Sequence, residues 1–182
     1  KTRLVILNTP HNPTGGILRK ADLDAIAEIL ARHPRIWVFA DEIYSRLAYD
    51  GAFDSIATRP GLLERTVICD GASKTWAMTG WRIGFAANRT LAPVFTRWIT
   101  NTDSCASQIS QWAAVEAIQG PQHAAAAMKQ SFFERRDFIV RLLRAGVRRK
   151  DGTFATGVLH LWPAEADRSQ LSANESKLSE IV

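Results

Sequence analysis

Short apolar runs alternate with helical patterns along most of the chain. The first run covers residues 4–7, and a loop rich in proline and glycine follows it. The next segment carries apolar residues at the i, i+3, i+4, i+7 spacing of one buried helix face, namely Leu23, Ile26, Ala27 and Leu30. Three further runs of strand length cover residues 36–40, 66–69 and 83–87. This alternation predicts an α/β fold with a mostly parallel sheet.

Helical patterns dominate the second half of the chain. They run from about residue 91 to 149 and are broken at Gly120 and Pro121. Residues 123–145 form one amphipathic pattern, which predicts a single long helix. The chain begins at Lys1, and an apolar run starts almost at once, at Leu4. A domain seldom opens inside a buried strand, so we expect the chain to be a fragment.

Polar residues whose side chains can bind a ligand or react follow three of the predicted strands. Asn12, Asp41 and Lys74 each lie just after the end of a different run. In open α/β sheets, ligands bind beyond the carboxyl ends of the strands. The pattern therefore predicts that these three residues face one crevice.

Composition excludes several other classes of protein. The 182 residues carry a net charge of +5, and no apolar run approaches the roughly 18 residues of a membrane span. The late basic residues could contact nucleic acid, but Glu134 and Asp137 interrupt them, which favours a solvated helix face. Cys69 and Cys105 lack the C-x-x-C spacing of a metal site or a disulfide framework. We expect two buried thiols in a cytoplasmic protein, with no metal, no nucleic acid and no membrane as partners.

Three segments together resemble a known enzyme family. Residues 8–15 read NTPHNPTG, residues 40–44 read ADEIY, and residues 73–84 read SKTWAMTGWRIG. They are similar, in order and spacing, to the three cofactor segments of class I/II aminotransferases of fold type I. The lysine segment looks most like the branch of prokaryotic aspartate and aromatic aminotransferases.

The resemblance implies a fold and a domain plan. We expect a three-layer α/β sandwich, in which residues 1–140 form part of the large domain that binds pyridoxal phosphate. Residues 141–182 would begin the small C-terminal domain, truncated or divergent after about residue 154. Family members are homodimers that act on an amino acid and a 2-oxo acid, so we expect these substrates and a homodimer for the full-length protein.

The resemblance also implies a role for each site residue. The Lys74 amine would condense with the cofactor aldehyde and later carry a proton to and from the substrate. Asp41 would pair with the pyridine nitrogen, although an aspartate here can also cap a helix. Tyr44 and Asn12 would hydrogen-bond the phenolic oxygen of the cofactor; alternatively, Tyr44 is a packing aromatic and Asn12 a turn residue.

Phosphate binding is assigned to Arg82, with Ser73 as a further ligand. The fork of a guanidinium matches two phosphate oxygens. Many members carry a hydroxyl residue where this chain has Gly71, so fewer phosphate ligands are expected. The same cofactor residues would serve a lyase or a decarboxylase, or the effector domain of a transcription regulator, and these alternatives remain open.

Overall fold

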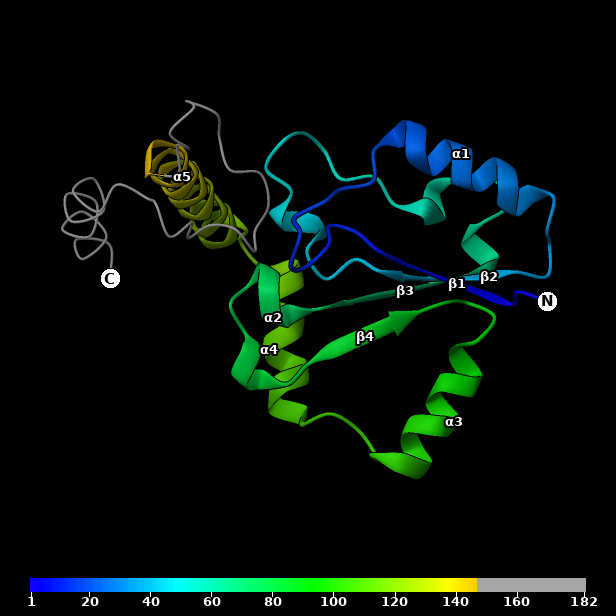
Figure 1. Cartoon of the computed structure of the whole chain (residues 1–182). Helices are drawn as coiled ribbons and strands as arrows, with labels where there is room; N and C mark the ends of the chain where they lie inside the picture. Colours follow the sequence, from blue (N-terminus) through cyan, green and yellow to red (C-terminus); the bar gives the residue numbers. More distant parts are fainter. Residues whose placement is uncertain (147–182) are drawn as a thin grey trace. The chain divides into compact units, whose positions relative to one another are not determined.

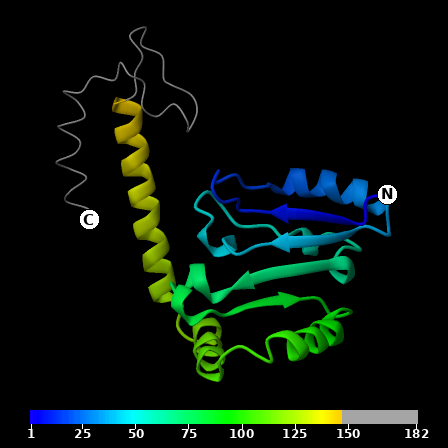
Figure 2. The ribbon, with the colours of Figure 1, turned by 60° about the horizontal axis from the view of Figure 1, so that its bottom comes forward.

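The computed structural model describes residues 1–146. Four strands, β1 (Leu4–Asn8), β2 (Trp37–Asp41), β3 (Thr66–Gly71) and β4 (Gly84–Ala87), form one sheet in that order. β1, β2 and β3 run parallel, and β4 runs antiparallel to β3, as the arrowheads in Figure 2 show. The predicted α/β fold with a mostly parallel sheet is therefore confirmed.

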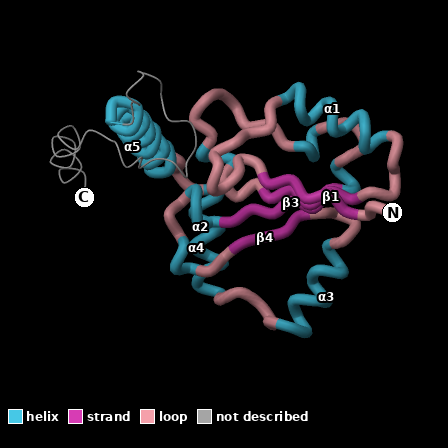
Figure 3. Tube along the Cα trace, viewed as in Figure 1, coloured by secondary structure: helices cyan, strands magenta, loops and turns pink. Residues whose placement is uncertain are grey.

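Helices connect the strands. α1 (Lys20–Ala31) joins β1 to β2, and α2 (Ala72–Thr75) is a single turn after β3. α3 (Ala92–Thr102) and α4 (Gln108–Gln119) follow β4, and α5 (His123–Gly146) is the predicted long helix. Figure 1 shows α1 on one side of the sheet and α3 on the other, and Figure 3 separates strands from helices by colour.

Two details of the helical half differ from the prediction. The helical pattern after residue 91 has a second break between α3 and α4, where Ser104 adopts a left-handed backbone with φ of 66°. This segment contains neither proline nor glycine, the residues that usually end a helix, so the sequence does not predict the break. The end of the predicted helical region, residues 147–149, lies outside the described residues.

The chain divides into two units, the first Lys1–Ala127 and the second from Met128 on, of which the structure describes residues 128–146. The sheet and the predicted cofactor residues all belong to the first unit. In the second unit, the exposed side chains of Arg135 and Arg141 are consistent with the solvated helix face expected from sequence. The predicted domain boundary near residue 140 stays a prediction, and the expected change after residue 154 lies outside the described residues.

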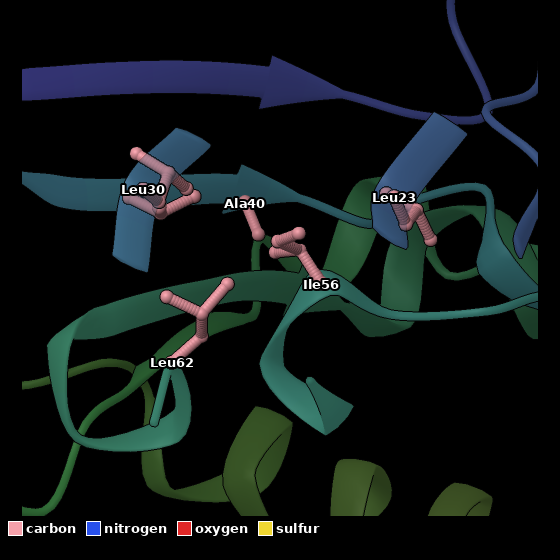
Figure 4. Packing of buried hydrophobic residues seen from close by; sticks show 6 residues of the cluster. Leu23, Leu30, Ala40, Ile56 and Leu62 are labelled. Carbon is pink, nitrogen blue, oxygen red and sulfur yellow. The ribbon is translucent and has the colours of Figure 1, made fainter. Parts of the chain in front are cut away.

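The core of the first unit lies on the α1 side of the sheet. Leu23 and Leu30 of α1 pack against Val38 and Ala40 of β2, and Ile56 and Leu62 complete the cluster (Figure 4). Leu23 and Leu30 occupy the helix face predicted from their spacing. Burial of such side chains from water is the main force that holds α1 on the sheet.

The opposite face of β1 is open to solvent in the described structure. Val5 and Leu7 pack against the core, whereas Leu4 and Ile6 are 51% and 66% exposed. Successive side chains of a strand point to opposite faces, which explains the alternation. Both faces of β1 are therefore apolar, as in a strand that is covered on both sides.

Arg65 fixes the end of α1 to the start of β3. Its guanidinium donates hydrogen bonds to the carbonyl oxygens of Leu30, His33 and Ile36 at 2.9, 3.0 and 3.1 Å. These carbonyls lie at the end of α1 and in the loop that follows it, and those of Leu30 and His33 also accept hydrogen bonds from the backbone N–H groups of His33 and Ile36. Arg65 therefore ties the loop between α1 and β2 to the residue before β3.

One sequence expectation about the thiols is wrong. Cys69 in β3 is half-buried, but Cys105, in the loop before α4, is exposed. Both are free thiols. Separately, no helix in the described part of the chain is long and apolar enough to span a membrane. Cys105 lies in the segment between α3 and α4, residues 103–107, in which every side chain is exposed or half-buried.

Candidate functional site

The carboxyl ends of β1, β2 and β3 meet at one edge of the sheet. Asn8 is in register with Asp41, and Asp41 is in register with Cys69. The loop that carries Asn12 leaves β1 at this edge, and α2, which carries Lys74, leaves β3 there. The structure thus places the three residues at one edge, as their positions after three predicted strands indicate.

Asp41, the last residue of β2, is held from two sides. The side-chain amide of Asn8 donates a hydrogen bond to Oδ2 of Asp41 at 2.6 Å. The backbone N–H of Ile43 donates to Oδ1 at 3.4 Å, which is long for a hydrogen bond. The backbone N–H of Thr9 also donates to the Asp41 carbonyl at 3.2 Å, so the loop after β1 is tied to the end of β2.

Tyr44, Asn12 and Lys74 form a second group at the edge of the sheet where β2 ends in Asp41. The side-chain amide of Asn12 donates to the phenolic oxygen of Tyr44 at 3.0 Å. The Nζ of Lys74 lies 5.9 Å from the centroid of the Tyr44 ring, within the range of a cation–π contact. Tyr44 and Lys74 are half-buried and Asn12 is exposed. An amine, a phenol and an amide from three separate segments therefore converge.

The loop that presents Asn12 is held by its own hydrogen bonds. The N–H of Gly15 donates to the His11 carbonyl at 2.7 Å, and the N–H of His11 donates to the Gly16 carbonyl at 2.8 Å. Gly15 has φ of 71°, a left-handed conformation that glycine adopts without steric cost. Thr9 Oγ1 accepts from the N–H of Leu18 at 3.0 Å and closes the loop at its base. Asn12 thus projects from an ordered turn.

Gly71 brings the segments of Lys74 and Arg82 together. It pairs with Gly84, and the N–H of Ala72 donates to the Ile83 carbonyl at 3.3 Å. A Cβ on Gly71 would lie 3.0 Å from that carbonyl oxygen and 3.1 Å from the Cα of Gly84. A side chain at this position would press on these backbone atoms, and its absence lets the start of α2 lie against the residue after Arg82.

Arg82 and Ser73 lie on either side of this contact. Arg82 is exposed, its Nη1 donates to the Thr79 carbonyl at 3.0 Å, and its φ is 51°. A left-handed backbone is uncommon for a residue other than glycine, and such residues cluster at functional sites. Ser73 is half-buried on the same turn as Lys74. Among the described residues, no hydrogen bond or ion pair joins the side chain of Ser73 or of Arg82 to that of Lys74.

Acidic groups lie just behind this edge. Burial raises the pKa of the Glu42 carboxyl, against a hydrogen bond of 2.5 Å from Ser55 that lowers it, and the charge of Asp70 raises it further. Burial also raises the pKa of the Asp70 carboxyl, against a hydrogen bond from its neighbour Gly71 and the charge of Arg46. The same cause raises the pKa of the Cys69 thiol, so this thiol is not activated.

Sequence reasoning missed Asn8 as a site residue. It is the first residue of the NTPHNPTG segment. As a polar residue at the end of the otherwise apolar strand β1, it could have been recognised from the sequence as a site residue. Its contact with Asp41 depends on strand register, which the sequence does not reveal. Glu42 follows Asp41 directly, but only the structure shows that it points into the protein, with 7% of its surface exposed.

Comparison with curated proteins finds relatives among the aminotransferases. The chain is 40% identical over 151 residues to an aspartate/prephenate aminotransferase of Cereibacter sphaeroides, a match that covers 79% of this chain and 36% of the relative. It is 43% identical over 148 residues to an aspartate aminotransferase of Rhizobium meliloti, covering 80% of this chain and 36% of the relative. The chain thus spans little more than a third of these relatives.

Solved structures give the same result. The aspartate aminotransferase of Rhizobium meliloti superimposes with a TM-score of 0.76 at 41% identity, covering 85% of this chain and 40% of the other. An aromatic aminotransferase of Pyrococcus horikoshii superimposes with a TM-score of 0.74 at 36% identity, covering 78% of this chain and 39% of the other. The sheet and its helices therefore match part of the large domain of these enzymes.

The family profile described as aminotransferase class I and II matches residues 1–173. It includes all three segments from which the resemblance was inferred. Members of this family use pyridoxal phosphate. The chain belongs to the class I and II aminotransferase family.

Proposed function

We propose that the protein containing this chain transfers an amino group between an amino acid and a 2-oxo acid, with pyridoxal phosphate as cofactor. The observation that carries the proposal is the convergence of Lys74, Tyr44 and Asn12 at the carboxyl edge of the sheet, where β2 ends in Asp41, in a chain of an aminotransferase family. Aspartate is the amino donor that we infer first, because two relatives are named for their action on aspartate.

The chemistry of these residues fits the cofactor. Asp41 offers a carboxylate for a protonated ring nitrogen, and Tyr44 and Asn12 offer polar hydrogens for a phenolic oxygen. Lys74 offers an amine for an aldehyde. When bound, pyridoxal phosphate supplies a ring that accepts the electrons released at the substrate Cα.

Lys74 would have two tasks in this reaction. Its amine would anchor the cofactor and, once displaced by the substrate amine, would carry the Cα proton. The ring of Tyr44, 5.9 Å from Nζ, would limit where the freed amine moves. The hydrogen bond of 3.0 Å from Asn12 would fix the Tyr44 hydroxyl beside the cofactor oxygen.

Arg82 and Ser73 are the proposed phosphate ligands. The exposed guanidinium of Arg82 has one donor on the Thr79 carbonyl, and its other N–H groups can bind two oxygens of a phosphate. Ser73 precedes Lys74 on α2, so its hydroxyl would approach the cofactor from the same segment. The left-handed backbone of Arg82 supports a functional role.

The proposal extends to assembly and location. A homodimer is proposed from family membership. A cytoplasmic location is proposed because Cys69 and Cys105 are both free thiols, as is usual in a reducing compartment.

Transfer of a labelled amino group tests the proposed reaction. In a chimera, this chain would replace the matching segment of the Rhizobium meliloti aspartate aminotransferase, which supplies the remaining parts of the fold. With ¹⁵N-aspartate and 2-oxoglutarate, the expected product is ¹⁵N-glutamate, and Lys74→Ala should abolish it. Release of ammonia or carbon dioxide in place of labelled glutamate would indicate a lyase or a decarboxylase and contradict the proposal.

A further inference from the structure

We propose that Asn8 is a positioning residue that fixes the Asp41 carboxylate for the ring nitrogen of the cofactor. This inference rests on the proposed function, because it assigns to Asn8 a task that matters only if Asp41 meets that nitrogen. Asn8 itself would not touch the cofactor in this role. It acts through the orientation of Asp41.

Strand register creates the contact. Asn8 and Asp41 are the last residues of β1 and β2, and they are directly paired in the parallel sheet. Their side chains meet at 2.6 Å, from the amide nitrogen of Asn8 to Oδ2 of Asp41. A hydrogen bond this short, with a carboxylate as acceptor, is of the stronger, charge-assisted kind.

The orientation of the Asn8 amide is set by Asp41. The amide oxygen, Oδ1, is buried and has no hydrogen-bond partner among the described residues. Turning the amide over would place this oxygen against the carboxylate, and two acceptors at that distance repel each other. An asparagine that leaves one buried acceptor unpaired in order to donate to a neighbour is poorly explained by strand stability alone.

Asn8 also determines which carboxylate oxygen is available. Oδ2 of Asp41 is engaged by Asn8, whereas Oδ1 has only the long contact of 3.4 Å with the Ile43 N–H. Without Asn8, the carboxylate would be free to rotate about its last bond. The Asn8 contact therefore holds Asp41 in one rotamer, with Oδ1 able to accept a further donor such as a ring N–H.

Two ligands that differ at one ring atom test this role. Dissociation constants would be measured for pyridoxal phosphate and for its 1-deaza analogue, which has a C–H in place of the ring nitrogen, with the full chain and with Asn8→Leu. Leucine has nearly the shape of asparagine but donates no hydrogen bond. Asn101→Leu is the matched control, because Asn101 is exposed on α3 and its amide donates, among the described residues, to a backbone carbonyl of its own helix.

The expected pattern is specific to the ring nitrogen. The unmodified chain should bind pyridoxal phosphate more tightly than the deaza analogue. Asn8→Leu should weaken pyridoxal phosphate binding about tenfold, the effect of losing one hydrogen bond to a charged group, and leave the analogue within about twofold. Asn101→Leu should change neither constant.

Other patterns would overturn the inference. If Asn8→Leu weakens the binding of both ligands equally, Asn8 serves only the structure. If Asn8→Leu leaves both dissociation constants unchanged, Asp41 does not need Asn8 to meet the ring nitrogen. If Asn8→Leu does not fold, Asn8→Ser is read in the same way, since its hydroxyl is too short to span the same contact. If the unmodified chain binds pyridoxal phosphate and the deaza analogue equally well, the role of Asp41 in the proposed function is overturned, and this inference with it.

Discussion

The Nζ of Lys74 lies 5.9 Å from the centroid of the Tyr44 ring, and the Tyr44 hydroxyl accepts a hydrogen bond of 3.0 Å from Asn12. These residues come from the segments that follow three neighbouring strands. The parallel order of β1, β2 and β3 is what brings them together. The site is thus a consequence of topology, and its residues can be tested one segment at a time.

Tyr44→Phe removes the acceptor of the Asn12 amide and the hydroxyl proposed to meet the cofactor oxygen. Affinity for pyridoxal phosphate is expected to fall about fivefold, the effect of one neutral hydrogen bond. Asn12→Ala should have a similar effect, and the double variant should lose less than the sum of the two, because the residues share one contact. Titration of cofactor fluorescence measures each constant. If the loss of binding free energy in the double variant equals the sum of the two single losses, Tyr44 and Asn12 do not act through a shared contact.

Arg82→Lys keeps the positive charge but loses the planar fork. Affinity for pyridoxal phosphate is expected to fall at least tenfold, because a lysine ammonium cannot bind two phosphate oxygens in the same way. Affinity for pyridoxal, which has no phosphate, should stay the same. The two dissociation constants are measured side by side. A parallel loss for pyridoxal would place Arg82 outside the phosphate site.

Gly71→Ala puts a methyl group against backbone atoms of Ile83 and Gly84, at 3.0 and 3.1 Å. The free energy of unfolding is expected to fall by about 1–3 kcal/mol, the usual effect of overpacking. Gly80→Ala is the control, because no atom lies within 4 Å of the added Cβ. Urea denaturation compares the two variants. Equal stability of both would show that the β3–β4 contact adapts freely.

Glu42→Gln tests the cost of a buried carboxylate. Because burial raises the pKa of Glu42, the folded protein binds its proton more tightly than the unfolded chain does. Stability therefore falls as the pH rises from the ordinary glutamate pKa through the raised one. Glutamine keeps an acceptor for Ser55 and carries no charge, so the stability of Glu42→Gln relative to the unmodified chain should improve as the pH rises.

Denaturant unfolding of both proteins between acid and neutral pH measures this difference. Glu28→Gln, on the exposed face of α1, is the matched surface control. If the stability of Glu42→Gln relative to the unmodified chain declines as the pH rises, the pKa of Glu42 is lowered on folding and not raised. The ionised form of Glu42 would then be stabilised in the folded protein.

Much of the fold was predictable because its signals are local. The apolar runs mark β1 to β4 to within a residue or two, and the spacing of Leu23 and Leu30 identifies the buried face of α1. The common edge of Asn12, Asp41 and Lys74 followed from a general property of parallel sheets. The cofactor roles came from a resemblance and stay predictions.

The remaining features depend on distances that the sequence does not contain. Asn8 meets Asp41 only because β1 and β2 pair without a shift of register. Glu42 is buried while its neighbour Asp41 is half-buried, because successive residues at the end of β2 face different surroundings. The exposure of Cys105 likewise depends on its place in the segment between α3 and α4, where no residue is buried.

The most direct test of the account is the position of the cofactor adduct. The chain would be incubated with pyridoxal phosphate, reduced with borohydride, digested and analysed by mass spectrometry. The account predicts one modified peptide, with the adduct on Lys74, and no stoichiometric adduct in Lys74→Ala. A principal adduct on any other lysine, or none at all, would contradict the assignment of Lys74 as the cofactor anchor.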